Sequence, residues 1–199
     1  GEMFRCGPLY KHVPGALPVN RHFLNNGYEA VSIGKIYHHK SDEKRGWSRE
    51  AFHAKGQWAG RGYLTPGAAA LVREYDGKHP EASRKGMGPA FECADVPDNA
   101  YEDGLAADRA VEELNRLQDQ PFFLAVGFHK PHLPFNAPRK YWDLYREEDI
   151  RPAGNPFAPK DAPKEALTDW GELRGYHGIP ASGPLPDDLA RRLIHGYRA

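Results

Sequence analysis

Two clusters of lysine and histidine are the part of this sequence best suited to chemistry. Each cluster follows a short apolar stretch of the kind that forms a buried strand. In open α/β sheets, ligands collect at the carboxyl ends of strands, so parallel neighbouring strands would bring the two clusters to one edge. The clusters are Gly34-Lys35-Ile36-Tyr37-His38-His39-Lys40 and Gly127-Phe128-His129-Lys130-Pro131-His132.

Lysine and histidine side chains that converge in this way suit a tetrahedral anion. A lysine ammonium supplies a point charge, and a histidine ring supplies a directed hydrogen-bond donor. A histidine can also pass a proton to a leaving group near neutral pH. The two clusters therefore predict an anion site that could also perform acid–base catalysis.

Simpler interpretations exist for both clusters, and an ordinary solvated loop is one of them. His129 and His132 could bind a metal, but Pro131 keeps them off a regular helix and no carboxylate lies at ligand spacing. The stretch from Gly27 to Lys35 is not a phosphate-binding loop, because six residues rather than four precede its Gly-Lys pair and no Ser or Thr follows. No serine lies in a nucleophile-elbow sequence.

Helices and strands that alternate along the chain would position these clusters, which is typical of an α/β fold. Apolar residues at helical spacing predict helices over 17–27 and 101–119, a short one after Pro138, and one from Pro186 onward. Residues 28–33 predict a buried strand. Residues 122–128 form a continuous apolar run, typical of a strand covered on both faces.

The region 36–100 lacks a clear period, and we expect a long excursion with one short helix over 68–74. Asp98 or Asn99 is expected to cap the helix over 101–119. Glu102 and Asp103 would then complement the dipole in its first turn.

Charge and composition exclude several classes of function. The 199 residues carry 27 basic and 27 acidic side chains, so no global field recruits nucleic acid. No apolar stretch approaches the roughly 20 residues that span a bilayer. Gly1 to Cys6 has no apolar core behind a basic start, so we expect no signal peptide in this chain. Cys6 and Cys93 are too few for a disulfide framework, and they could pair or both be free.

Together, the two clusters and their flanks resemble a known family. The segment from Gly27 to His38 resembles that of type I sulfatases, in which an Asn-Gly-Tyr turn leads through a strand to Gly-Lys and a nearby His. Pro121 to Phe135 is similar to the P-F-F-L-A-V-G-x-x-K-P-H-x-P-F signature of the iduronate-2-sulfatase group. Residues 95–98, the helix that follows them, and residues 184–186 also fit that group. The similarity covers nearly the whole chain.

The resemblance implies an α/β fold like that of alkaline phosphatase and sulfatases, with a central sheet flanked by helices. It implies hydrolysis of a sulfate ester on a sulfated sugar, with a divalent cation (Ca²⁺ or Mg²⁺) and a formylglycine as cofactors. Lys35 matches the lysine that contacts sulfate, His38 the histidine that binds the formylglycine hydrate, and His129 the histidine near the leaving oxygen. Lys130 and His132 belong to the same motif and are expected on the substrate side.

The family's other elements are not found in this sequence. No C/S-x-P-S/A-R motif occurs, since Cys6 precedes Gly-Pro-Leu-Tyr, and neither an early Asp-Asp pair nor a late Asp-His-Gly is present. We therefore expect residues 1–199 to be the middle portion of one catalytic domain, with the nucleophile and metal ligands supplied by the remainder of that domain. By resemblance, the enzyme would be periplasmic, secreted or lysosomal.

Two other functions remain open from the sequence. One is a related phosphoryl or phosphonate ester hydrolase of the same superfamily. The other is a non-catalytic module that binds sulfated polysaccharide through Lys35, His38, His129 and Lys130, although the neutral net charge counts against it.

Overall fold

The computed structural model describes residues 13–37, 45–54, 62–81, 87–155, 157–166 and 171–199. The chain forms two compact units. Unit 1 comprises residues 1–55 and 98–129, and unit 2 comprises residues 56–97 and 130–199. Both contain parallel strands and helices, which confirms the predicted α/β class.

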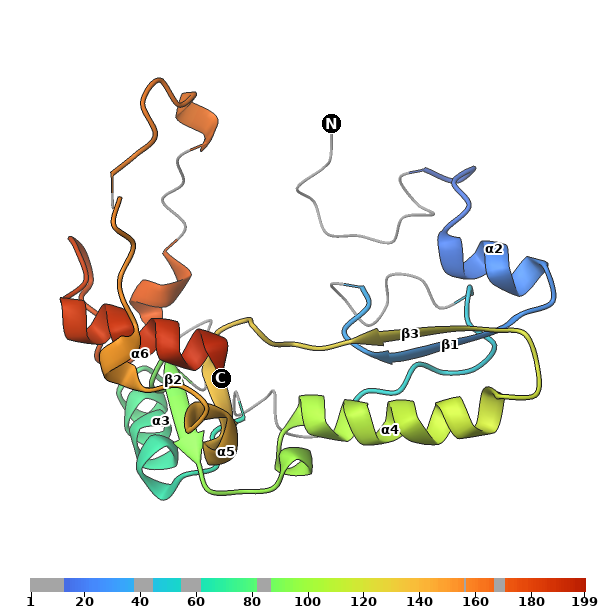
Figure 1. Ribbon diagram of the computed structural model, residues 1–199, viewed down its shortest axis with the longest axis horizontal. Helices are drawn as coiled ribbons and strands as arrows, with labels where there is room; N and C mark the ends of the chain where they lie inside the picture. The colour runs from blue at the N-terminus through green and yellow to red at the C-terminus, as the bar shows by residue number, and fades with distance from the viewer. Residues whose placement is uncertain (1–12, 38–44, 55–61, 82–86, 156, 167–170) are drawn as a thin grey trace. The chain divides into compact units, whose positions relative to one another are not determined.

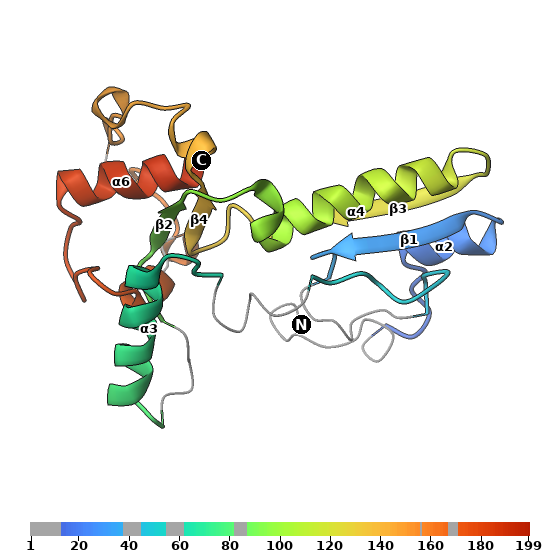
Figure 2. The ribbon, with the colours of Figure 1, turned by 90° about the horizontal axis from the view of Figure 1, so that it is seen from below.

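Unit 1 is built around two parallel strands, β1 (Glu29–Gly34) and β3 (Phe122–Gly127). Helices α2 (Val19–Asn25) and α4 (Glu102–Leu117) lie on opposite faces of this pair (Figure 1, Figure 2). All four elements were predicted near these positions, and the parallel pairing is the arrangement on which the anion-site prediction depends.

The core of unit 1 lies between the strands and α4, because alternate strand residues face that helix. Val31 and Ile33 of β1 are buried against Ala106 and Leu117 of α4. On the opposite face, Phe123 of β3 stacks on Phe23 of α2 with ring centroids 4.7 Å apart, and Trp47 packs beside it. Because alternate side chains point to opposite faces, the strand pair packs against one helix on each face.

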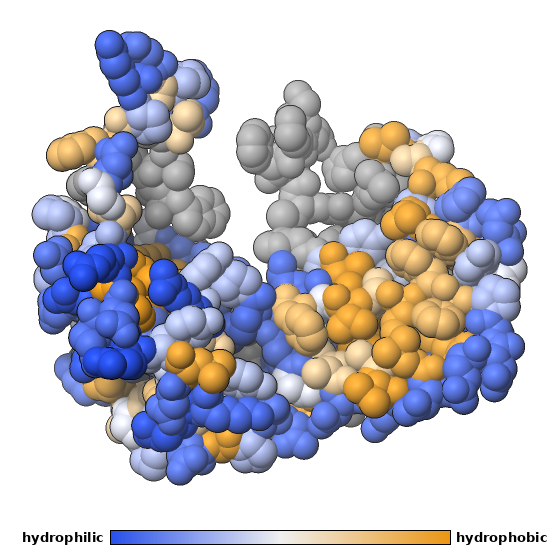
Figure 3. All heavy atoms as spheres, viewed as in Figure 1, coloured by the Kyte–Doolittle hydropathy of each residue, from blue (hydrophilic) through white to orange (hydrophobic). Residues whose placement is uncertain are grey.

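Strand β3 is covered by a helix on each face, as its apolar run predicts, because α2 and α4 both pack against it. Its six residues are only half-buried, since among the described residues the strand pairs with β1 alone. Figure 3 shows hydrophobic side chains gathered over this part of the molecule. Neither Asp98 nor Asn99 caps α4: both lie in a 3₁₀ turn, η2 (Asp98–Ala100), and Tyr101 stands at the N-cap position without a side-chain cap bond.

The two strands come unusually close where they end. Gly34 has φ +71°, in the region that favours glycine, and a Cβ placed on it would lie 2.1 Å from the carbonyl oxygen of Gly127. A Cβ on Gly127 would lie 2.0 Å from the carbonyl oxygen of Lys35. The Lys35 backbone N–H donates to the Gly127 carbonyl at 2.7 Å. Glycine at both positions therefore allows this approach.

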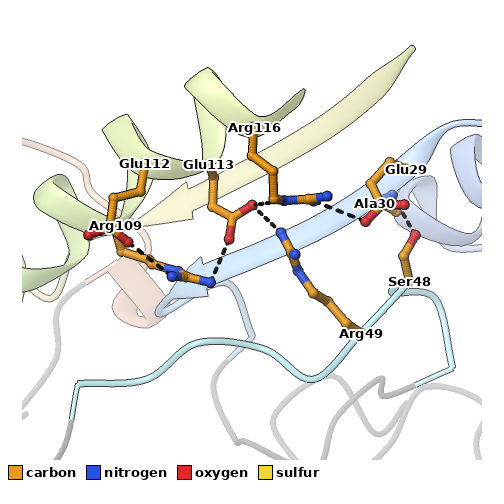
Figure 4. A network of polar contacts seen from close by, with 8 residues as sticks. All are labelled: Glu29, Ala30, Ser48, Arg49, Arg109, Glu112, Glu113 and Arg116. Atoms are coloured by element: carbon orange, nitrogen blue, oxygen red, sulfur yellow. Dashed lines mark hydrogen bonds and ion pairs between the residues drawn. The ribbon is translucent and has the colours of Figure 1, made fainter. Parts of the chain in front are cut away.

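A buried carboxylate fixes the far part of α4. Glu113 is 2% exposed and contacts three guanidinium groups, those of Arg49, Arg109 and Arg116 (Figure 4). Arg116 also reaches Glu29 of β1 at 3.0 Å. The cluster thus ties α4 to β1 and to the segment that contains Arg49.

Unit 2 contains a second parallel pair, β2 (Phe91–Ala94) and β4 (Phe135–Pro138). Its core is formed by Met87, Ala90, Tyr176 and Leu193. Three α-helices and three 3₁₀ helices complete its described part: α3 (Pro66–Lys78), α5 (Arg139–Trp142), α6 (Asp187–Arg198), η3 (Glu147–Asp149), η4 (Lys164–Ala166) and η5 (Glu172–Gly175).

The region that the sequence left unassigned contains more structure than expected. Helix α3 is longer than the predicted 68–74, and β2 was missed. Glu92 of β2 is buried and accepts hydrogen bonds from the backbone N–H groups of Leu64 and Thr65 and from the Thr65 hydroxyl. This carboxylate therefore fixes the start of α3 beside the strand.

We expect Glu113→Gln to destabilise the protein by about 2–4 kcal/mol, because three arginines lose a buried counter-charge while retaining some access to solvent. Burial acts most strongly on Glu113 and raises the pKa of its carboxyl, but Arg116, Arg49 and Arg109 outweigh it and leave the pKa below the ordinary value of 4.5. The native state thus binds this proton less readily than the unfolded state, and the charge contributes stability above about pH 4.5.

That contribution is lost as the pH falls through the lower native pKa, so the difference between wild type and Glu113→Gln should shrink in acid. Urea unfolding at pH 7 and at a series of lower pH values measures it. Glu112→Gln is the matched control, since its carboxylate is 65% exposed and should contribute less than about 1 kcal/mol. A Glu113→Gln difference that does not change with pH would contradict this account.

We expect Gly127→Ala to destabilise the protein by at least about 2 kcal/mol, because its Cβ would overlap backbone atoms that cannot rotate away. Gly77→Ala in α3 is the control: nothing lies within 4 Å of its added Cβ, and alanine should be neutral or stabilising by up to about 1 kcal/mol. Urea midpoints measure both. Equal midpoints for Gly127→Ala and wild type would show that the strand ends are not so close.

Candidate functional site

Lys35 is the first residue after β1, at the carboxyl end of the strand pair. Its backbone N–H is held by the Gly127 carbonyl, so the position of its main chain depends directly on the end of β3. A lysine here presents a compact charge on a flexible stem beside the edge where ligands collect in α/β sheets.

His129 lies two residues after the end of β3, at the same end of the sheet. Its backbone N–H donates to Oδ1 of Asp103 at 2.8 Å. Its ring Nδ1 lies 3.3 Å from Oε2 of Glu102 and 3.9 Å from Oδ1 of Asp103. The histidine side chain is 24% exposed and the Glu102 side chain 14%, so this contact is only partly open to solvent.

The direction of α4 explains why its acidic first turn meets His129. The helix runs antiparallel to β3 and is joined to it by a short turn after Leu117, so its N-terminus lies where β3 ends (Figure 1). From the sequence, Glu102 and Asp103 were expected to complement the helix dipole, and their contact with His129 was missed. The contact could have been predicted from the sequence, because both acids lie at the start of a helix that leads directly into β3.

Lys130 and His132 lie in unit 2, since the boundary between the units falls after His129. The Lys130 ammonium donates to the Pro134 carbonyl and approaches that of His132 at 3.5 Å. The ring of His132 lies 2.6 Å from the Leu133 carbonyl and 3.8 Å from Glu172. The Lys130–Pro131 and Leu133–Pro134 bonds are both cis. Most of these contacts are with carbonyl groups of the segment 132–134, so they stabilise the local conformation after His129. A substrate-side role for Lys130 and His132 stays a prediction.

The structure thus brings Lys35 and His129 to one end of one sheet. His38, the third predicted catalytic residue, lies outside the described residues. A cation and a histidine backed by carboxylates can bind an anionic group and exchange a proton with it.

The described residues do not provide a metal site or an activated thiol. Among them, no group of three or more His, Cys, Asp and Glu side chains is arranged to hold a metal ion. Burial raises the pKa of the Cys93 thiol, which is free, and this favours the protonated thiol over the thiolate at neutral pH. Cys6 lies outside the described residues. Cys93 is followed by Ala-Asp-Val-Pro and so does not lie in a C/S-x-P-S/A-R motif. The described residues therefore fit neither a metal ion nor a formylglycine.

Unit 2 contains an open pocket of about 370 Å³. None of the predicted site residues lines it. Its lining includes Glu92, Cys93, Trp142, Glu147 and Arg192. Within the part of the chain that the structure describes, no helix is long and apolar enough to span a bilayer.

No protein-family model matches the chain. Iduronate 2-sulfatase of Mus musculus is 29% identical over 195 residues, which cover 91% of this chain and 33% of that protein. Iduronate 2-sulfatase of Homo sapiens is 28% identical over 202 residues, covering 94% and 35%. A sulfatase of Formosa agariphila is 30% identical over 134 residues, covering 65% and 25%.

The chain thus spans about a third of the length of the curated relatives that it matches. The agreement extends over nearly the whole chain, so it includes both strand ends that carry Lys35 and His129. Over nearly its whole length the chain is thus similar to iduronate 2-sulfatases, and over shorter stretches it is similar to other sulfatases and to a protein of the alkaline phosphatase superfamily.

Proposed function

We propose that this chain is the middle portion of a sulfatase catalytic domain and that it binds the sulfate and the leaving oxygen of a sugar sulfate ester. The observation that supports this most directly is the position of Lys35 and His129. Each follows one of two parallel strands whose ends meet at Gly34 and Gly127. An anionic substrate at that edge would have a cation on one side and a proton donor on the other.

Lys35 would bind the sulfate oxygens. Charge on those oxygens is stabilised when a preplaced cation replaces water, as it is in phosphoryl transfer. The hydrogen bond between the Lys35 backbone and Gly127 supports this role, because it fixes the base of a flexible side chain.

His129 would act on the leaving group. In hydrolysis, water replaces the sugar oxygen on sulfur, and the electron pair of the broken S–O bond remains on that oxygen. A sugar alkoxide is a poor leaving group unless it receives a proton, and a neighbouring imidazolium can supply one. The ring changes from imidazolium to neutral imidazole as the alcohol forms.

The remaining parts of the reaction are assigned elsewhere in the domain. Sulfatases typically use a metal ion and a formylglycine, and the described residues fit neither. We place those groups on sequence outside this chain, with His38 as the residue that meets the formylglycine. Lys130 and His132 would lie on the substrate side.

A sugar substrate is the simplest choice. The relatives from Mus musculus and Homo sapiens are iduronate 2-sulfatases, and iduronate is a sugar acid. A sugar alcohol needs protonation as it leaves, and this agrees with a histidine at the position of His129.

In the full-length enzyme, we expect Lys35→Ala and His129→Ala to reduce kcat on a sulfated disaccharide by about 10²–10⁴-fold, the usual contribution of such groups. The two variants should differ in their activity on 4-nitrophenyl sulfate, because its phenolate leaves without needing a proton. Lys35→Ala should remain impaired on that ester, whereas His129→Ala should recover most of the activity. Steady-state kinetics on the two substrates measure the difference.

His22→Ala and Lys78→Ala serve as controls, since both side chains are exposed in helices α2 and α3. Circular dichroism establishes that each variant is folded. Near-wild-type turnover of the sugar sulfate by both site variants would overturn the proposed function. Activity on the matching phosphate ester, with none on the sulfate, would assign the chain to a phosphoryl ester hydrolase instead.

A further inference from the structure

Glu102 approaches His129 in a way that a helix-dipole role does not require. A carboxylate anywhere in the first turn of α4 would complement the dipole. Glu102 is instead 14% exposed, and its Oε2 lies 3.3 Å from the ring Nδ1 of a histidine on another element. Asp103 holds the backbone of the same histidine at 2.8 Å.

We propose that Glu102 is a positioning residue for His129 and fixes which ring nitrogen carries out proton transfer. The inference rests on the proposed function, in which His129 protonates the leaving oxygen. Asp103 assists by anchoring the His129 backbone, so ring and main chain are held by adjacent residues of one helical turn.

The contact determines the protonation pattern of the ring. A carboxylate oxygen is an acceptor, so Nδ1 must present its N–H to Glu102, because an unprotonated Nδ1 would set two acceptors against each other. In the neutral ring, this leaves Nε2 as the unprotonated nitrogen. The proton given to the leaving oxygen therefore comes from Nε2, and Nδ1–H stays with Glu102 throughout.

The contact also raises the fraction of imidazolium. An opposite charge within about 4–6 Å favours the charged form of a titrating group. Glu102 and Asp103 lie 3.3 Å and 3.9 Å from Nδ1, and both favour the imidazolium. Asp98 in η2 has the same sign of charge. Three other groups of unit 1 would oppose the imidazolium: Lys35 after β1, Arg109 of α4, whose guanidinium lies over the Phe52 ring, and His53, which follows Phe52 at the end of β1, when it is protonated.

The test uses pH profiles of the full-length enzyme on a sulfated disaccharide. Glutamine at 102 keeps an oxygen for Nδ1–H but removes the charge, so Glu102→Gln should move the basic limb of the kcat profile down by about one pH unit. Glu112→Gln, an exposed site on the same helix, should leave the limb in place. In a His129→Ala background, Glu102→Gln should have no further effect on kcat.

Nitrogen-15 NMR of histidine-labelled protein gives a readout that does not depend on turnover. The His129 resonances, assigned by their loss in His129→Ala, should report a neutral ring protonated at Nδ1 and a titration that moves down in Glu102→Gln. Glu102→Asp keeps the charge on a shorter side chain and should give a smaller shift, which provides the same test if the glutamine variant folds poorly by circular dichroism.

The outcomes separate the two proposals. An unmoved basic limb and an unmoved His129 titration in Glu102→Gln, with His129→Ala still impaired, would overturn the positioning role and leave the proposed function intact. Full sugar-sulfate turnover by His129→Ala would overturn the leaving-group role itself, while the NMR titration would still decide whether Glu102 controls the ring.

Discussion

The close approach of β1 and β3 at their carboxyl ends is the constraint on which the rest of unit 1 depends. Two glycines face each other there, and a Cβ on either would meet a backbone carbonyl oxygen at about 2 Å. Because the two strand ends are so close, they fix the positions of the Lys35 main chain and of the segment that leads to His129. The residues that follow two separate strands can then contribute side chains to one anion site, because the strand ends themselves hold the two main chains close together.

The helix that precedes β3 completes the arrangement. A short connection forces α4 to run antiparallel to β3, and its first turn must therefore lie beside the end of that strand. Glu102 and Asp103 meet His129 for this topological reason. Apolar residues on one face of α4 hold the helix against β1 and β3, so packing in the core determines where the two carboxylates lie.

The sequence predicted the elements whose signal is local. Helical periodicity located α4 and α6, and the apolar run located β3. Each of these signals is a pattern of apolar residues within one continuous segment, so it can be read without knowing the rest of the fold. Strand β2 was missed because its four residues include Glu92, whose burial depends on donors from Leu64 and Thr65 that lie far away in the sequence. Lys35 and His129 could be named from their motifs, but the carboxylate partner of His129 required the direction of α4 in space. The cap was misassigned because Asp98 folds into a turn of its own.

Helix α4 carries two groups of charges with separate consequences. Glu113 lies eleven residues beyond Glu102, about 16 Å along a helix that rises 1.5 Å per residue. Of its three arginine partners, Arg109 lies seven residues beyond Glu102, about 10 Å along the helix, Arg116 lies farther along it, and Arg49 lies on another segment. Exposed charges are largely screened beyond about 8–10 Å at physiological ionic strength. The arginines are each neutralised in part by Glu113, which weakens their field further. The stability of the helix and the protonation of His129 should therefore respond to different substitutions, so a loss of activity at Glu102 can be separated from a loss of fold.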